Sequence, residues 1–220
     1  MPTNACTADK QFYPYERVQA FGTVPELEQV PYIVRDYLMD MPKAGYMPQD
    51  DNNLYRCRLM KYLYNDGPRP LEDPLPTPQE KISVVFDPEN PTQAPTEKGY
   101  RIFSQSMISQ AQTMGQTIMR IYMGRAVPTD SYTTEASIII MFMSNAAYDA
   151  NTKTVELNRT FNMACLALRA LNGVNIKGVG TVYFDRRRHG DCNITPVQDE
   201  TTNVGYRLTM GISMTGGEPE

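Results

Sequence analysis

The run ASIIIMFMS, residues 136–144, is the stretch from which the fold can be worked out. Its first half is β-branched and nearly all of it is apolar, whereas a strand with one solvated face would alternate apolar with polar residues. The run therefore predicts a central strand that is covered on both faces. The polar loop PTDSYTTE, residues 128–135, separates it from whatever precedes it.

The segment before that loop carries two periodicities. Helical spacing is shown by Met107, Ala111, Met114 and Ile118, and strand alternation by Thr117, Met119, Ile121 and Met123. Gly115 is the natural point of change between the two patterns. The sequence predicts a short helix over about 104–114 and then a strand over about 116–124, which ends at Gly124-Arg125.

The clearest helical pattern begins near Asn151. Its apolar ridge is formed by Leu157, Phe161, Ala164, Leu168 and Leu171, which are separated by steps of four and three residues. Gly173 follows as a C-terminal cap. The spacing predicts one long amphipathic helix that lies on the sheet.

Two further strands are predicted after this helix. The first lies around GTVYFDRR, residues 180–187, and the second lies in VGYRLTMGISMTG, residues 204–216. In the second, Tyr206, Leu208 and Met210 alternate with polar residues. The element order predicts the α+β class, with a mainly antiparallel sheet and a long amphipathic helix packed on one face, preceded by helical and Pro-rich N-terminal segments.

The N-terminal third has a different character. Residues 1–24 mix aromatic residues with Pro and Gly and read as an arm. Helices are predicted from Pro31 to Pro42 and from Asn52 or Asn53 to Gly67-Pro68. The Pro-rich stretch GPRPLEDPLPTPQ, residues 67–79, predicts a stiff strap, and Ile82–Phe86 a short strand, with a brief strand at Tyr100–Phe103. We place the domain division between residues 1–79 and residues 80–220.

Composition restricts the classes of function. The chain has 21 Lys plus Arg against 25 Asp plus Glu, a net charge of −4, which gives no global attraction to nucleic acid. Its four cysteines show no CxxC spacing, and its one histidine cannot complete a local metal set. Nothing in the sequence resembles a signal peptide, and no apolar span reaches 18 residues, so we expect no membrane partner. The 14 Met and 14 Tyr suggest protein interfaces, although Met can also replace Leu in a core.

The stretch LNGVNIKGVGTVYFDRRRHGDC, residues 171–192, raises the question of a phosphate or metal site. GVG at 178–180 lacks the third glycine of a dinucleotide fingerprint, and it stands after a helix rather than before one. The glycines more plausibly permit a tight corner between helix and strand. Arg186–Arg188 is either a solvated strand end or a donor of salt bridges to a neighbouring subunit. His189, Asp191 and Cys192 lack further ligands and favour a surface turn.

No sequence motif of a known catalytic site occurs in the chain. GxSxG, HExxH and the phosphate-binding lysine loop are all missing from the sequence. We therefore expect no enzyme, no catalytic residue, no metal and no cofactor.

Four phrases of the chain resemble virion proteins of tailed bacteriophages, specifically small neck proteins of the tail-terminator or tail-completion type. They are YRIFSQSMISQAQ (100–112), RIYMGRAVPTDSYTTEASIIIMFMS (120–144), ALNGVNIKGVGTVYFD (170–185) and GYRLTMGISMTG (205–216). The resemblance covers roughly residues 80–216. It implies a ring, usually a hexamer, that ends the tail tube, faces the head-side connector and has no active site, in a virion assembled in the host cytoplasm.

The resemblance also implies partners and contact residues. The partners would be other copies of the chain, the tail tube protein and the connector proteins, while DNA could pass through the ring without sequence-specific binding. A head-to-tail ring joins two unlike surfaces of the same chain. For these contacts we predict Phe12, Tyr13, Tyr15, Arg120, Arg125, Arg186, Arg187 and Arg188.

Other hypotheses stay open at this point. One is another phage structural component, such as a head-closure, sheath-associated or baseplate protein. The others are a solitary binding module, which predicts a stable monomer, and an enzyme with a site assembled from distant residues, which predicts a pocket of ionisable groups with shifted pKa values.

Overall fold

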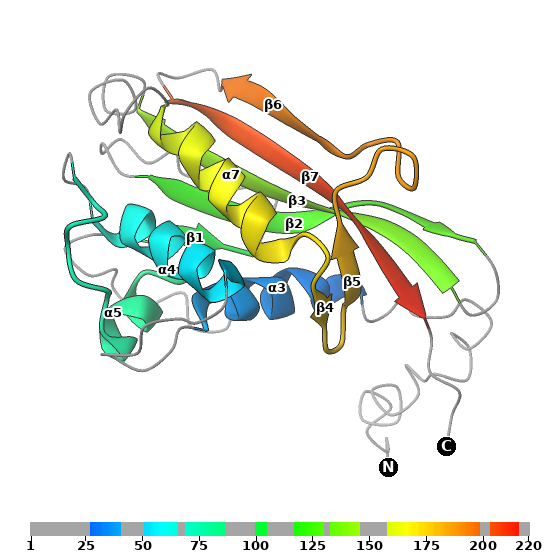
Figure 1. The fold of residues 1–220 in the computed structure, drawn as a ribbon, viewed down its shortest axis with the longest axis horizontal. Coiled ribbons are helices and arrows are strands. Elements are labelled where there is room, and N and C mark those ends of the chain that lie inside the picture. The colour runs from blue at the N-terminus through cyan, green and yellow to red at the C-terminus, as the bar shows by residue number, and fades with distance from the viewer. Residues whose placement is uncertain are drawn as a thin grey trace, which may run out of the picture.

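The computed structural model describes eight parts of the chain: residues 27–40, 51–65, 69–86, 100–104, 117–129, 133–145, 158–198 and 203–215. The helices there are α3 (Val30–Met39), α4 (Asp51–Tyr64), α5 (Pro78–Ser83) and α7 (Arg159–Leu171). The strands are β1 (Ile102–Phe103), β2 (Ile118–Pro128), β3 (Thr133–Asn145), β4 (Asn175–Ile176), β5 (Gly180–Tyr183), β6 (Asn193–Gln198) and β7 (Asn203–Thr215). Figure 1 shows them as a curled sheet with helices against it.

Strand β3 lies at the centre of this sheet, as its sequence predicts. The strand order is β1-β2-β3-β7-β5-β4, and β3 is antiparallel to both neighbours. On one side of β3, Ile138, Ile140 and Phe142 are completely buried. On the other side, Ile139 and Met141 are only half-buried, so coverage of the two faces is unequal.

One edge of β7 is shared by two strands. Strand β5 pairs with the end of β7, from Thr181 opposite Ser213 to Tyr183 opposite Gly211. Strand β6 pairs with its beginning, from Asn193 opposite Thr209 to Gln198 opposite Val204. The two strands thus follow one edge, and residues 184–192 form a loop that interrupts them. The exposed Pro196 in β6 suits an edge strand, because proline cannot donate to a further neighbour.

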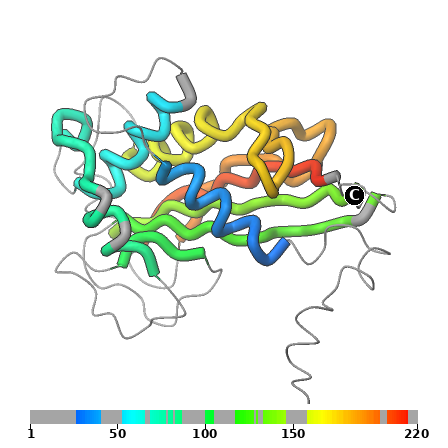
Figure 2. The backbone as a smooth tube through the Cα atoms, turned by 90° about the horizontal axis from the view of Figure 1, so that it is seen from below, coloured from blue at the N-terminus to red at the C-terminus, as the bar shows by residue number. Residues whose placement is uncertain are grey.

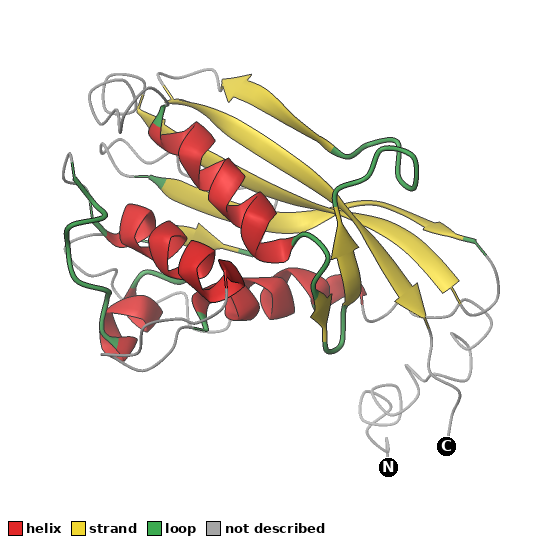
Figure 3. Ribbon diagram, viewed as in Figure 1, coloured by secondary structure: helices red, strands yellow, loops and turns green. Residues whose placement is uncertain are grey.

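The helices α3, α4 and α7 form a layer on one side of the sheet (Figures 2 and 3). Helix α3 contacts β2, α7 contacts β3 and β7, and α4 packs against α7. Their buried side chains belong to the same apolar cluster as the inner side chains of β2, β3 and β7. On α7 the fully buried positions include Met163, Ala167 and Ala170, while Phe161 and Leu168 of the predicted ridge are half-buried.

The predicted fold class was wrong. The sheet is curled and mixed, because β1 runs parallel to β2, and no long amphipathic helix covers it in the part of the chain that the structure describes. Helix α7 has 13 residues, or about 20 Å at 1.5 Å per residue, whereas the 13 residues of β3 span about 43 Å. One helix of this length cannot cover such strands, so several short helices share the face. The start near Asn151 lies outside the described residues; the described helix begins after Asn158.

The predicted strand Ile82–Phe86 was also wrong. Residues Pro78–Ser83 form helix α5, and only Val85 makes a bridge, to Ile102. The Thr77 backbone N–H donates to Glu80 at 2.8 Å, and the Glu80 N–H donates to the Thr77 hydroxyl at 3.3 Å. This reciprocal capping box stabilises the first turn of α5. The spacing Thr77-x-x-Glu80 is the signal that the strand interpretation overlooked.

Other predicted elements are confirmed. Helices α3 and α4 lie where Pro31 and Asn52 indicated, and β1, β2, β5 and β7 lie at the predicted strands. The predicted end of β2 at Gly124-Arg125 was wrong, because the strand continues to Pro128. Gly173 follows α7 with a φ of 80°, and its N–H donates to the Val182 carbonyl at 2.8 Å, so the helix-to-strand corner is also confirmed. Residues 105–114 of the predicted helix, the arm and residues 130–132 of the predicted loop at 128–135 lie outside the described residues. Pro128 and residues 133–135 of that loop belong to β2 and β3. The division at residue 79 stays a prediction.

Buried arginines hold the carboxyl ends of two helices. Arg159 donates to the carbonyls of Tyr62 and Asn65 at the end of α4, and Arg101 donates to Leu63 at 2.7 Å. In the same way Arg56 donates to Tyr37 in the last turn of α3, also at 2.7 Å. The last carbonyls of a helix have no partner within the helix, so these guanidinium groups satisfy and electrostatically stabilise them.

Candidate functional site

The sheet face opposite the helices carries a row of polar and sulfur-containing side chains. Across neighbouring strands, Arg120 of β2 lies opposite Met141 of β3, Met141 lies opposite Arg207 of β7, and Thr195 of β6 continues the row. We call these four residues the arginine row. Because side chains alternate along a strand, all four point away from the buried Ile140. At about 4.8 Å between strands, the two arginines start about 10 Å apart.

The next row places Tyr122, Ile139, Thr209 and Asn193 alongside the arginine row. Burial raises the pKa of Tyr122, and the nearby charges of Arg207 and Arg120 partly oppose that rise. Both guanidinium groups therefore lie within electrostatic reach of the Tyr122 hydroxyl. The described part of these two rows contains no carboxylate.

Several buried polar atoms of the two rows lack hydrogen-bond partners among the described residues. They are Arg207 Nε, Thr195 Oγ1 and Asn193 Oδ1. Arg120 does not belong with these unpaired groups, because it has an interaction partner. Buried polar groups in folded proteins are nearly always paired, so a group of unpaired atoms on one face calls for a partner outside the described chain. Arg, Tyr and Met are also the residue types enriched at protein interfaces.

The loop between β5 and β6 carries the three consecutive arginines. The Asp185 carbonyl accepts the backbone N–H groups of Arg188 and His189 at 3.1 and 2.9 Å, and the Asp185 carboxylate accepts that of Arg187 at 2.9 Å. These bonds shape the turn and leave Arg186, Arg187 and Arg188 exposed. Both interpretations of these arginines, a solvated strand end and a donor of salt bridges to a neighbouring subunit, are compatible with this exposed position.

His189 lies in the same turn, as predicted, but its ring is buried rather than at the surface, with 8% exposure. Its Nδ1 lies 3.9 Å from Asp191 Oδ2, and the Cys192 thiol donates to the Tyr183 carbonyl at 3.8 Å. Among the described residues no group of three or more His, Cys, Asp and Glu could hold a metal. The described part of the chain also contains no helix long and apolar enough to cross a membrane.

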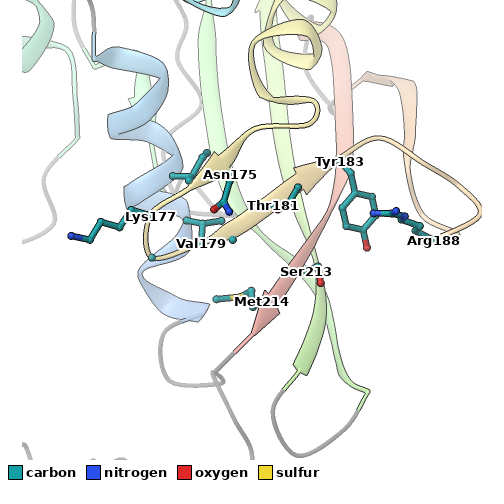
Figure 4. A pocket seen from close by; sticks show the side chains of 11 residues that line it. Asn175, Lys177, Val179, Thr181, Tyr183, Arg188, Ser213 and Met214 are labelled. Carbon is teal, nitrogen blue, oxygen red and sulfur yellow. The ribbon is translucent and has the colours of Figure 1, made fainter. Parts of the chain in front are cut away.

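A hollow of about 430 Å³ lies beside the β4–β5 hairpin (Figure 4). Tyr183 and Arg188 line one side of it together, with the guanidinium 5.7 Å from the ring centre, while Lys177 extends away from them. The Tyr183 ring packs over Gly211, where a Cβ atom would clash with it. Burial, followed by the Glu135 charge, raises the pKa of Tyr183. The raised pKa favours the neutral form of this buried phenol.

The structure places the predicted contact residues at separate positions. Arg120 lies in the arginine row. Arg188 stacks on Tyr183, whose side chain is on the same sheet face as Arg207 because Tyr183 lies opposite Gly211 of β7. Arg125 is exposed at an irregularity of β2, where its N–H donates to the Ser137 hydroxyl at 2.8 Å. Phe12, Tyr13 and Tyr15 lie outside the described residues. Sequence reasoning missed Arg207, although the alternation in β7 had already placed it on the polar side of that strand.

Comparison with known proteins places the chain among phage-related proteins. The family is YomW, whose model matches residues 57–212, and the chain belongs to it. The match begins within α4 and includes every described strand except the last three residues of β7, as well as both arginines of the arginine row. The family name specifies neither an activity nor a place in a particle. No curated protein matches significantly.

Proposed function

We propose that this protein is a structural virion protein that forms a ring at the neck of a tailed phage, ends the tail tube and joins it to the head-side connector. The observation that carries the proposal is the arginine row together with the adjacent Tyr122, which form a mixed Arg, Tyr and Met surface on the sheet face opposite the helices (Figure 2). Such a composition suits a protein partner. The phage-related family supports a virion setting, and the four resembling phrases support the neck.

A closed ring needs two different surfaces on each copy, which meet head to tail. The exposed loop Arg186–Arg188 lies at the edge of the sheet, next to the sheet face that is opposite the helices. In our proposal this face and this loop belong to one of the two surfaces. In such a ring the helical layer on the other side of the sheet would supply the second surface.

The native mass tests the proposal. Light scattering over a concentration series, with negative-stain images of the same samples, should give a closed ring of about six copies. Purified tail tubes incubated with the protein should carry one ring at an end. A protein that stays monomeric at every concentration and leaves tube ends bare would contradict the proposal.

Reversal of two loop charges should weaken assembly without unfolding the chain. In Arg187→Glu/Arg188→Glu the turn keeps its backbone hydrogen bonds to Asp185, so circular dichroism should match the parent protein. The two substitutions remove exposed ion pairs with the neighbouring copy and place glutamates where its carboxylates lie, so association should weaken by about tenfold. Sedimentation velocity measures the change.

The matched control is Arg58→Glu/Arg69→Glu, which changes the net charge equally at exposed positions of the helical part. Equal weakening of assembly in both double variants would point to net charge alone. Normal assembly of Arg187→Glu/Arg188→Glu would remove the loop from the interface.

A further inference from the structure

Arg207 is a half-buried cation that has no hydrogen bond or ion pair with any described residue. Its Nε is buried, and the neighbouring Thr195 Oγ1 and Asn193 Oδ1 also lack partners. The buried part of a guanidinium that has no partner destabilises the chain that carries it, because the charge is partly desolvated without compensation. Its position is therefore explained best by an anion that arrives from elsewhere.

The chemistry of the surroundings identifies that anion. The guanidinium groups of Arg207 and Arg120, the Thr195 hydroxyl and the Tyr122 phenol can all donate hydrogen bonds. Two like charges about 10 Å apart repel a cation and attract an oxyanion. The planar guanidinium binds a carboxylate with two parallel hydrogen bonds.

The described sheet cannot supply this carboxylate. Glu135 is its only acidic strand residue, and it lies six residues from Met141 along β3, or about 20 Å. Over the described part of residues 100–215, three acidic residues (Glu135, Asp185 and Asp191) stand against ten basic ones. The whole chain has 25 acidic and 21 basic residues, so 22 of its acidic residues belong to other parts of the chain. A second copy therefore offers many carboxylates to a face that has almost none.

We propose that the arginine row receives a carboxylate side chain from a second copy of this chain, with Arg207 as its main partner and Arg120, Tyr122 and Thr195 around it. This inference rests on the proposed function and deepens it, because it names a residue that closes the contact between copies. The interleaved Met141 and Ile139 add apolar area to a contact of this kind.

The test replaces the charge and keeps the bulk. Arg207→Met should weaken association between copies by about tenfold or more, because it removes one partner of a desolvated charge pair. The association constant of the variant should also depend less on the NaCl concentration than that of the parent. In dilute samples of unassociated protein, its thermal midpoint should equal or exceed that of the parent, because an unpaired half-buried charge is gone. The association constant of Arg207→Lys should fall between those of the parent and Arg207→Met.

Arg58→Met on α4 is the matched control, since Arg58 is exposed on the opposite layer. Parent-like association of Arg207→Met would overturn the inference, and so would a marked fall of its thermal midpoint, which would show a partner within the same chain. Duplex DNA is the competing occupant. If Arg207→Met lowers DNA binding in a gel-shift titration but leaves self-association unchanged, the carboxylate assignment is overturned.

The outcomes separate the inference from the function. A six-membered ring that is indifferent to Arg207 would leave the proposed function in place and remove the inference. A dimer that depends on Arg207 would keep the inference and remove the ring. No self-association under any condition would remove both.

Discussion

Arg159→Met is expected to lower the free energy of unfolding by about 3 kcal/mol or more. Arg159 is completely buried at the start of α7, and its guanidinium donates to the Tyr62 and Asn65 carbonyls and, at 3.1 Å, to the Thr117 hydroxyl. Methionine would leave these acceptors buried without donors, at about 1–3 kcal/mol each. Urea denaturation followed by circular dichroism measures the loss.

The position of Arg159 explains why the effect should be large. It joins α7 to the end of α4, the helix that packs against it, and to Thr117 just before β2. Its charge also lies where the dipole of α4 is negative. Loss of the side chain should therefore loosen α4 from the sheet as well as remove hydrogen bonds.

The control for this prediction lies on the same helix. Arg169 is exposed and stacks over the Tyr55 ring at 5.5 Å, so Arg169→Met should cost about 1 kcal/mol or less. Arg159→Lys should retain the charge but lose the forked geometry, with an intermediate loss. An Arg159→Met protein as stable as Arg169→Met would show that the helix-end contacts contribute little.

The sequence predicted those elements whose residues carry a strong local pattern. The apolar run of β3 predicted a central strand, and Gly173 predicted the end of α7. Helix beginnings were harder, because the step from Leu157 to Phe161 continues the spacing of α7 without marking where the helix begins. The long helix was wrong for that reason, and the parallel pairing of β1 with β2 has no local signal in the sequence.

Long-range pairing limited the prediction of the site in the same way. Arg120 was selected as a contact residue, but its partner row depends on which strands are neighbours, and no local pattern places Arg207 two strands away. The buried roles of Arg101 and Arg159 were equally hidden, because a lone arginine is exposed in most proteins. Net charge was also a poor guide, since the described sheet is basic within an acidic chain.

The glycine-rich stretch at residues 178–180 has a structural role in the hairpin of β4 and β5. Strands β4 and β5 form a hairpin that lies against the end of β7, and a Cβ atom on Gly178 would lie 3.2 Å from the Ile33 side chain of α3. That hairpin forms part of the hollow beside Tyr183 and holds the edge from which the arginine loop departs. Its backbone contacts therefore position the loop that we propose as an interface.

Gly180→Ala should destabilise the protein by about 3 kcal/mol, through two effects that can be measured separately. Gly180 has a φ of 95°, which a side chain rarely adopts, and an added Cβ would lie well inside 3.0 Å of the Ser213 carbonyl oxygen. Gly173→Ala shares the positive φ but meets nothing within 4 Å, so it should cost only about 1 kcal/mol. Gly190→Ala has open space and no positive φ, and should be nearly neutral.

The difference between Gly180→Ala and Gly173→Ala, from parallel urea titrations, isolates the backbone approach of β5 to β7. Because that approach holds the arginine loop against the sheet, hydrogen exchange at Thr181–Tyr183 should rise in Gly180→Ala alone. If the two variants lose equal stability, the left-handed backbone accounts for the whole effect, and the hairpin tolerates a wider spacing from β7. The arginine loop would then be free to move with the hairpin, and its place in a rigid ring contact would need another support.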